Sequence, residues 1–156
     1  MTNDEIMKLG IDEADRTMRE NKGGPFGAVV VRDGEVIAVS SNHVLANNDP
    51  TAHAEIMAIR KACEKLGTYD LTGCELYATG YPCPMCLGAI IWANIKKIYV
   101  SGKPLDCAEI GFRDQFMYRF IRNGCINTDV LKIESLDREP AKMLYAEYAK
   151  MNKVIY

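Results

Sequence analysis

Apolar residues recur along the chain with the spacing of amphipathic helices and of short strands. Residues 3–20 predict a helix with one buried stripe made of Met7, Ile11, Ala14 and Met18. Residues 26–32 and 35–41 are apolar runs joined at Asp33-Gly34, a pair that favours a two-residue turn between antiparallel strands. The start of the chain therefore predicts a helix followed by a β-hairpin.

Beyond this hairpin, helical and strand-like segments alternate. A loop rich in Asn and Asp leads into a helix that is capped by Asp49 ahead of Pro50, or else by Thr51. The alternation predicts an α/β fold in which one mixed sheet is flanked by helices on both faces. We expect helices at 51–66, 82–94, 114–121 and 139–152, and strands at 74–80, 97–101 and 126–134.

Length and composition predict a single domain spanning residues 1–156. Apolar residues make up 48% and charged residues 26%, as in an ordinary globular protein. No apolar run approaches the roughly 18 residues of a membrane span, and the acidic start of the chain differs from an export signal. We therefore expect a cytoplasmic protein with no membrane partner. The net charge of −2 and the lack of a basic block disfavour a nucleic-acid partner.

Two of the six cysteines stand close together. Cys83 and Cys86 lie three positions apart in the run P-C-P-M-C, so they project from the same side of a helix. The start of a helix favours the thiolate form, which binds zinc well. A chain of this size without an export signal needs no disulfides. We interpret the other four as small buried hydrophobic residues: Cys63, Cys74, Cys107 and Cys125.

His53 and Glu55 can add a third zinc ligand and a proton-transfer group to the cysteine pair. His53 can complete three protein ligands for zinc together with Cys83 and Cys86. A catalytic zinc keeps its fourth position for water, whose pKa it lowers toward neutrality. Glu55 diverges from His53 on a helix, which places it to move protons between that water and a leaving amine. These residues predict hydrolytic removal of an amino group, with one Zn²⁺ and its water or hydroxide as cofactor.

Each fragment alone has other interpretations. A single C-x-x-C can be structural or redox-active, and a short His-x-Glu occurs by chance. A structural zinc has a closed set of four ligands, and the fourth could come from His43 or from one of the other cysteines. The two fragments together, about thirty residues apart, favour the catalytic site.

The joint pattern H-A-E…P-C-P-M-C resembles the cytidine-deaminase superfamily of zinc-dependent deaminases. Within that superfamily the chain resembles the small bacterial guanine deaminases along nearly its whole length. The resemblance implies a three-layer α/β/α sandwich around a central mixed sheet of five strands, with zinc held at two helix N-termini. It assigns His53, Cys83 and Cys86 to the metal and Glu55 to the proton shuttle. The segments that carry it are 24–28, 48–55, 58–63, 83–90, 108–114 and the aromatic Tyr156.

The resemblance also implies contacts with the base. Phe26 would stack on the purine ring and Asn42 would hydrogen-bond the base. Asp114 would lie near its ring N–H and amino edge. The backbone N–H of Ala54 would contact the base as well, and Trp92 lies on the helix that lines the pocket. Each residue also has a purely structural interpretation, as strand core, turn residue, helix cap or core aromatic.

The C-terminal segment has a further implied role. In the resembled family the segment at about 137–156 is exchanged between two subunits, so Tyr156 would close the partner's pocket. A homodimer follows from the resemblance.

One residue departs from the family pattern. The pattern has a glutamate before Pro82, whereas this chain has Tyr81. A tyrosine offers a donor and a flat face in place of a charge. The change leaves the zinc chemistry intact, and it bears on which base is preferred. The alternative is that the ring only packs at the strand end.

The leading hypothesis is an aminohydrolase of purine metabolism that converts guanine, a small-molecule nucleobase, to xanthine and ammonia. A deaminase of cytosine, another aminopurine or guanosine is the main alternative. A tRNA adenosine deaminase is less favoured because of the acidic balance. A non-catalytic zinc-fold binding module is disfavoured because His53, Glu55, Cys83 and Cys86 are all present.

Overall fold

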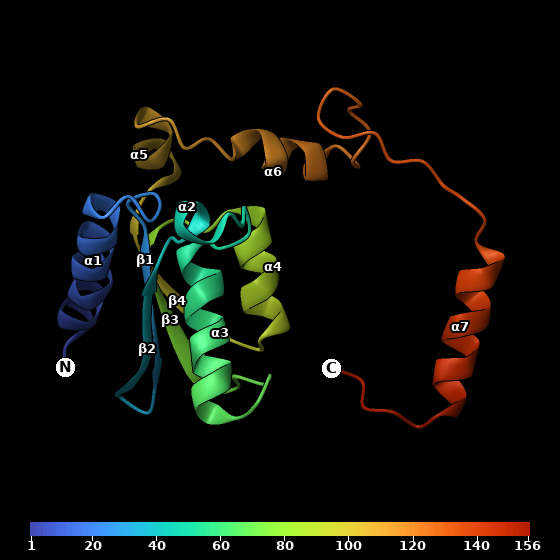
Figure 1. Ribbon diagram of the computed structural model, residues 1–156, viewed down its shortest axis with the longest axis horizontal. Helices are drawn as coiled ribbons and strands as arrows, with labels where there is room; N and C mark the ends of the chain where they lie inside the picture. The colour runs from blue at the N-terminus through green and yellow to red at the C-terminus, as the bar shows by residue number, and fades with distance from the viewer. The chain divides into compact units, whose positions relative to one another are not determined.

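A four-stranded sheet organises the first part of the chain in the computed structural model, which describes all of residues 1–156 (Figure 1). β1 pairs antiparallel with both β2 and β3, whereas β3 and β4 run parallel. The sheet is therefore mixed, as the sequence predicts. In the order β2-β1-β3-β4, its strands are β2 (Glu35–Ser41), β1 (Gly27–Arg32), β3 (Cys74–Gly80) and β4 (Lys97–Gly102).

The hairpin between β1 and β2 follows from its turn residues. Asp33 and Gly34 both have positive φ, 51° and 79°. This conformation suits the two-residue turn that matches the twist of paired strands. The prediction of a hairpin at this pair is confirmed.

Helices cover both faces of the sheet. Helix α1 (Asn3–Arg19) lies on one face, and helices α3 (Ala54–Leu66) and α4 (Pro84–Trp92) lie on the other (Figure 1). Strand β1 is apolar on both sides because it is buried between these layers. The remaining helices are α2 (Val44–Asn47), α5 (Pro104–Glu109), α6 (Gln115–Arg122) and α7 (Glu139–Lys150).

Alternate residues of β1 supply the two halves of the core. Val29 packs with Ile6 on the α1 side, and Val30 packs with the residues of α3 on the other side. Ala54 and Ala58 of α3 are fully buried. Their small side chains let the helix approach the sheet closely, which holds the first turn of α3 beside the end of the strands.

Helix α3 starts later than expected. Its N-cap is His53, and Asp49 serves the loop instead. The Asp49 carboxylate accepts hydrogen bonds from the backbone N–H (2.8 Å) and the hydroxyl (2.6 Å) of Thr51. This local turn competes with helix and keeps residues 51–53 extended or turned. Neither Asp49 nor Thr51 is therefore the N-cap of α3. The N-cap is His53, directly before the first residue of the helix.

The expectation of a fifth strand is wrong, because the sheet has four. No strand forms at residues 126–134. The Asn127 side chain accepts from the Asp129 N–H at 3.0 Å, and the Asn127 carbonyl accepts from Val130 and Leu131. This turn bends the segment where a strand would have to extend. Its apolar spacing alone could not specify a strand partner.

The chain divides into two compact units, residues 1–118 and residues 119–156. The second unit contains the end of α6, the Asn127 turn and α7. None of its residues is buried, and apolar side chains of α7 such as Leu144 are exposed. None of the helices combines the length and apolar character that crossing a bilayer requires.

Candidate active site and metal centre

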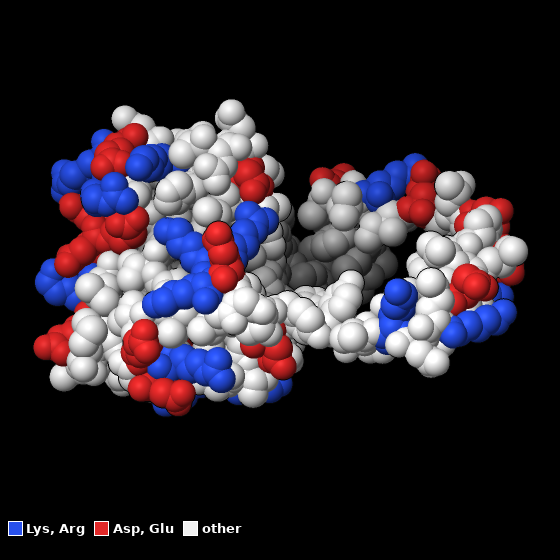
Figure 2. Space-filling model, turned by 60° about the horizontal axis from the view of Figure 1, so that its bottom comes forward, with Lys and Arg blue, Asp and Glu red and all other residues white.

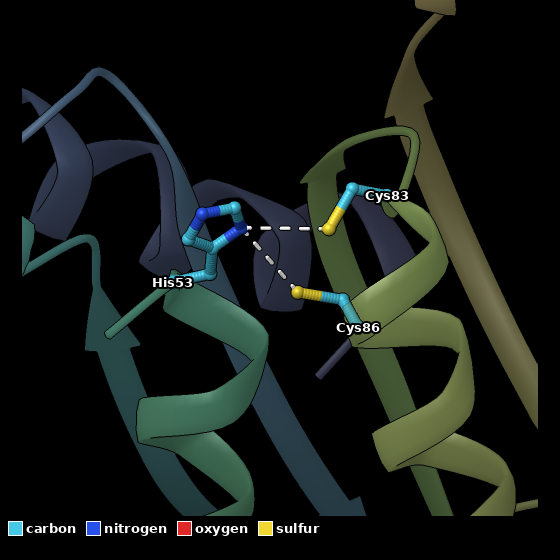
Figure 3. A group of neighbouring side chains, drawn as sticks. All are labelled: His53, Cys83 and Cys86. Atoms are coloured by element: carbon cyan, nitrogen blue, oxygen red, sulfur yellow. Dashed lines mark hydrogen bonds between the residues drawn. The ribbon is translucent and has the colours of Figure 1, made fainter. Parts of the chain in front are cut away.

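Two helix N-termini converge to form a group of metal-type ligands (Figure 3). His53 is the N-cap of α3 and Cys83 is the N-cap of α4, while Cys86 lies in the first turn of α4. The His53 side chain makes no hydrogen bond to α3, whereas the Cys83 thiol interacts with Cys86 of its own helix. The His53 ring and the Cys83 thiol point toward each other, as Figure 3 shows.

The spacing of the three ligand atoms fits one zinc ion. His53 Nδ1 lies 3.6 Å from Cys83 Sγ and 3.6 Å from Cys86 Sγ. Zinc–sulfur and zinc–nitrogen bonds of usual length, meeting at a tetrahedral angle, separate sulfur and nitrogen by about 3.6 Å. The residues therefore match the soft donor set and the geometry of a zinc site with three protein ligands.

The two cysteines are also electrostatically suited to a cation. A hydrogen bond from the Cys86 thiol lowers the pKa of Cys83 to about 4, and the His53 ring acts in the same direction. The pKa of Cys86 is raised, first by that hydrogen bond and then by burial. The hydrogen bond thus places a thiol proton between the two sulfurs. A divalent cation can replace this proton and stabilise both thiolates.

Glu55 lies against this group without belonging to it. Its side chain is buried, with 8% of the residue exposed, and its Oε2 accepts from the Cys86 thiol at 3.5 Å. Burial is the main cause that raises the pKa of this carboxyl group. A buried carboxyl group whose pKa is raised binds a proton more readily than an exposed one, which suits a group that takes up and returns a proton.

A cavity of about 380 Å³ opens beside His53, Glu55 and Cys83. A cavity of roughly 150 Å³ binds benzene, so this one has room for a two-ring base. Five residues with implied substrate contacts lie in its wall: Phe26, Asn42, Ala54, Tyr81 and Asp114. The fold thus brings together side chains that lie far apart in the sequence.

Asn42 is held by the loop that follows β2. Its side-chain oxygen accepts from the Val44 N–H at 3.0 Å, so its amide NH₂ remains available to a ligand. Gly23 makes this position possible: a Cβ at Gly23 would lie 2.2 Å from that oxygen and 2.4 Å from the Asn42 carbonyl. The two backbones meet too closely for any side chain at residue 23.

The ring of Phe26 is fixed by two neighbours. Phe112 contacts it edge-to-face, with ring centroids 5.0 Å apart and planes at 89°. On the other side, a Cβ at Gly80 would come within 3.2 Å of the Phe26 ring. Aromatic pairs in this arrangement hold a defined ring orientation, so Phe26 offers a preset apolar surface to the cavity.

Asp114 and Tyr81 close the wall nearest the metal-type ligands. Burial and the negative charge of Cys83 raise the pKa of the Asp114 carboxyl, which places this group within electrostatic reach of the cysteine. Tyr81 follows the end of β3, is 44% exposed, and its hydroxyl has no hydrogen-bond partner in the chain.

Two expected contacts are not placed in the cavity wall. Trp92 is the last residue of α4 and is 71% exposed. Tyr156 belongs to the second unit and is 79% exposed. Neither is a lining residue of the cavity in this single chain.

Several lining residues were not singled out from the sequence. Most come from two stretches without clear periodicity, the loop with α2 and the segment that carries α5 and the start of α6, whereas Gly24 precedes β1 and Gly80 ends β3. Gly24, Pro50, Phe112 and Arg113 fall in segments that carry the family resemblance, but no role was assigned to them. These additional residues are Gly24, Val44, Leu45, Pro50, Gly80, Cys107, Phe112, Arg113 and Met117.

Comparison with known proteins gives consistent matches. Residues 1–102 match the model of the cytidine and deoxycytidylate deaminase zinc-binding region. A guanine deaminase from Bacillus subtilis (strain 168) is 49% identical over 121 residues, which cover 78% of either chain. A tRNA-specific adenosine deaminase from Agrobacterium fabrum is 50% identical over 98 residues, 63% of this chain and 64% of that protein. An X-ray structure of guanine deaminase from Bacillus subtilis superposes with a TM-score of 0.92 at 41% identity. It covers 100% of this chain and 99% of that one.

Proposed function

Because the chain belongs to the cytidine and deoxycytidylate deaminase zinc-binding family, it is a hydrolytic deaminase, and we propose that its substrate is guanine. The reaction is guanine plus water to xanthine plus ammonia. The observation that carries this proposal is the buried Glu55 carboxyl group against the ligand trio, in the wall of a cavity with room for a purine. The match to a guanine deaminase along the whole chain supports the choice of base.

His53, Cys83 and Cys86 would hold one zinc ion in each subunit. When bound by three protein ligands, zinc supplies the Lewis acidity that lets water ionise near neutral pH. The family model and the spacing of the three ligand atoms support this metal.

Glu55 would carry the protons of the reaction. It takes one proton as the water oxygen adds to the ring carbon that bears the amino group, and it passes this proton to the adjacent ring nitrogen. It then takes the second proton from the added hydroxyl group, which becomes the new ring carbonyl, and delivers this proton to the amino group as the carbon–nitrogen bond breaks. The products are xanthine and ammonia, and the carboxyl group returns to its starting state.

The cavity wall would orient the base for this attack. Phe26 stacks on the rings, the Asn42 amide NH₂ donates to the base, and the Asp114 carboxylate accepts from its N–H and amino edge. The Ala54 N–H, at the first residue of α3, is a further donor. The open hydroxyl of Tyr81 provides a donor at the rim and contributes to the choice of base.

We also propose that two copies of the chain form a homodimer in which residues 137–156 are exchanged, bringing Tyr156 to the partner's cavity. The exposure of the apolar side chains of α7 supports this arrangement. Trp92 is exposed at the opposite end of α4 from Cys83, so its implied contact with the base stays a prediction.

A nucleic-acid substrate is less consistent with the visible surface. Figure 2 shows basic and acidic side chains interspersed on the face in view, without a broad basic stripe. Phosphate backbones are bound by clusters of Lys and Arg. This distribution favours a small-molecule base.

The test is ammonia release by the zinc-loaded protein from guanine, guanosine, adenine and cytosine in parallel. We expect turnover of guanine to exceed that of the other three by at least tenfold. A preference for another base would retain the hydrolytic chemistry, reject guanine as the substrate, and direct attention to Tyr81. A short tRNA stem-loop with adenosine in the loop serves as a fifth substrate, on which we expect no turnover.

A further inference from the structure

Tyr118 connects the wall of the cavity to the start of the helix that carries the cysteines. It lies in α6, and its hydroxyl donates a hydrogen bond to the backbone carbonyl of Pro82, 36 residues earlier. Burial is the main cause that raises the pKa of this phenol, which keeps the hydroxyl protonated and able to donate. Pro82 is buried and directly precedes Cys83.

The other end of this connection is the first turn of α6. The Asp114 carbonyl accepts from the Met117 N–H at 3.0 Å and from the Tyr118 N–H at 3.4 Å. Asp114 and Met117 both line the cavity. The backbone that positions these two side chains is therefore the same turn that Tyr118 attaches to Pro82.

A second polar contact joins the same two regions. The backbone of Tyr81 hydrogen-bonds to the Cys107 thiol. Both contacts end on the short connection between β3 and α4, at Tyr81 and Pro82. The segment from α5 to α6 is thus attached at the connection that leads into Cys83.

We infer that Tyr118 is a positioning residue, which fixes the Asp114 carboxyl relative to Cys83 and so orients the base in the cavity. This role rests on the proposed function, since Asp114 is assigned there to the edge of the base. Tyr118 does not line the cavity, and its hydroxyl bonds to Pro82 rather than to the ligand trio, so it acts through the first turn of α6. The hydrogen bond to Pro82 depends on one hydroxyl group, so removing that single oxygen atom tests the inference.

The experiment is Tyr118→Phe, with Tyr77→Phe as the matched control. Tyr77 also uses its hydroxyl for a link between distant segments, to Asn3 Oδ1 at 3.0 Å, on the face of the sheet covered by α1. We expect Tyr118→Phe to raise the KM for guanine about three- to tenfold, the range of one lost hydrogen bond. We expect kcat to change less than threefold, and Tyr77→Phe to leave both constants near wild type.

A double-mutant cycle with Asp114→Asn separates positioning from general destabilisation. If Tyr118 acts through Asp114, Tyr118→Phe has little further effect in the Asp114→Asn protein. Calorimetry measures the affinity for xanthine of wild type, Tyr118→Phe, Asp114→Asn and the double variant. This affinity does not depend on turnover. The visible spectrum of the cobalt-substituted protein should be the same in Tyr118→Phe and wild type.

An equal loss in the Asp114→Asn background would overturn the inference, as would an effect no larger than that of Tyr77→Phe. A changed cobalt spectrum would also overturn it, because Tyr118 would then act on the metal ligands. If wild type deaminates a base other than guanine, the proposed substrate fails independently. The same cycle measured on that base, with its product as the binding probe, then decides the role of Tyr118.

Discussion

The two units of the chain differ in whether their apolar side chains are buried or exposed. In residues 1–118, helices on both faces of the sheet bury a continuous core. In residues 119–156 no residue is buried, and Met143, Leu144 and Tyr145 of α7 are 72%, 68% and 67% exposed. Open apolar surface of this extent is typical of a segment stabilised by contacts outside its own unit.

Under the proposed homodimer, the difference separates the residues of the chemistry from those of the assembly. The ligand trio, Glu55 and every lining residue of the cavity belong to the first unit. A buried core holds the starts of α3 and α4 in place, and this rigidity suits a metal site, whose ligands must meet at fixed distances. No residue of the second unit belongs to the ligand trio or to the described cavity wall.

The largest expected effect tests the chemical side of this comparison. Glu55→Gln keeps the size of the side chain and removes its ability to move protons. We expect the rate of guanine deamination to fall about a thousandfold, within the range for a lost general acid–base group. Zinc content, measured by atomic absorption, should stay at the wild-type level because Glu55 is outside the ligand trio. A Glu55→Gln protein with substantial activity would refute the proposed mechanism.

The next effect tests the assembly side. Met143→Ser combined with Leu144→Ser removes apolar surface from α7, where each side chain that the proposed homodimer covers would contribute about 1.5–3 kcal/mol. We expect dissociation to monomers, measured by light scattering after size-exclusion chromatography, and a loss of more than tenfold in kcat/KM.

Ala146→Ser is the matched control for this pair, because it adds the same hydroxyl to an exposed position of the same helix. It should preserve the wild-type mass and activity. If the double variant kept the wild-type mass, α7 would have no role in association.

The smallest effect concerns a backbone contact at the cavity. Gly23→Ala forces Asn42 to move, since the new Cβ would overlap its side-chain oxygen. We expect KM for guanine to rise several-fold, with a modest loss of stability. Gly88→Ala is the control, because a Cβ there meets nothing within 4 Å and alanine favours helix α4 by about 1 kcal/mol. Equal KM values for the two variants would argue against a role of Asn42 in binding.

Local signals in the sequence were sufficient for the framework of the first unit. The Asp33-Gly34 turn and the H-A-E and C-x-x-C fragments each depend on neighbours a few residues away. The zinc-binding family is confirmed on these fragments. The expected stripe of α1 is wrong except at Ala14, because Ile11 is exposed and the buried face consists of Ile6, Gly10, Ala14 and Thr17. The roles of Phe26, Asn42 and Asp114 remain predictions, although the fold places all three in the cavity wall.

What the sequence could not indicate depends on packing between distant segments. Phe112 and Met117 enter the cavity because the segment after β4 returns to the β3–α4 connection, and no periodicity marks that path. The expected strand at 126–134 failed because a strand needs a partner, which apolar spacing cannot supply. The start of α3 was misplaced because the Asp49 turn holds residues 51–53 out of the helix.

The most direct test of the central claim is mass spectrometry of the product formed from guanine in ¹⁸O-labelled water by the zinc-loaded protein. Hydrolytic deamination in the first unit predicts xanthine that carries one ¹⁸O atom, with one ammonia released per xanthine, and only trace product from Glu55→Gln. Absence of xanthine, or xanthine without the label, would contradict the account.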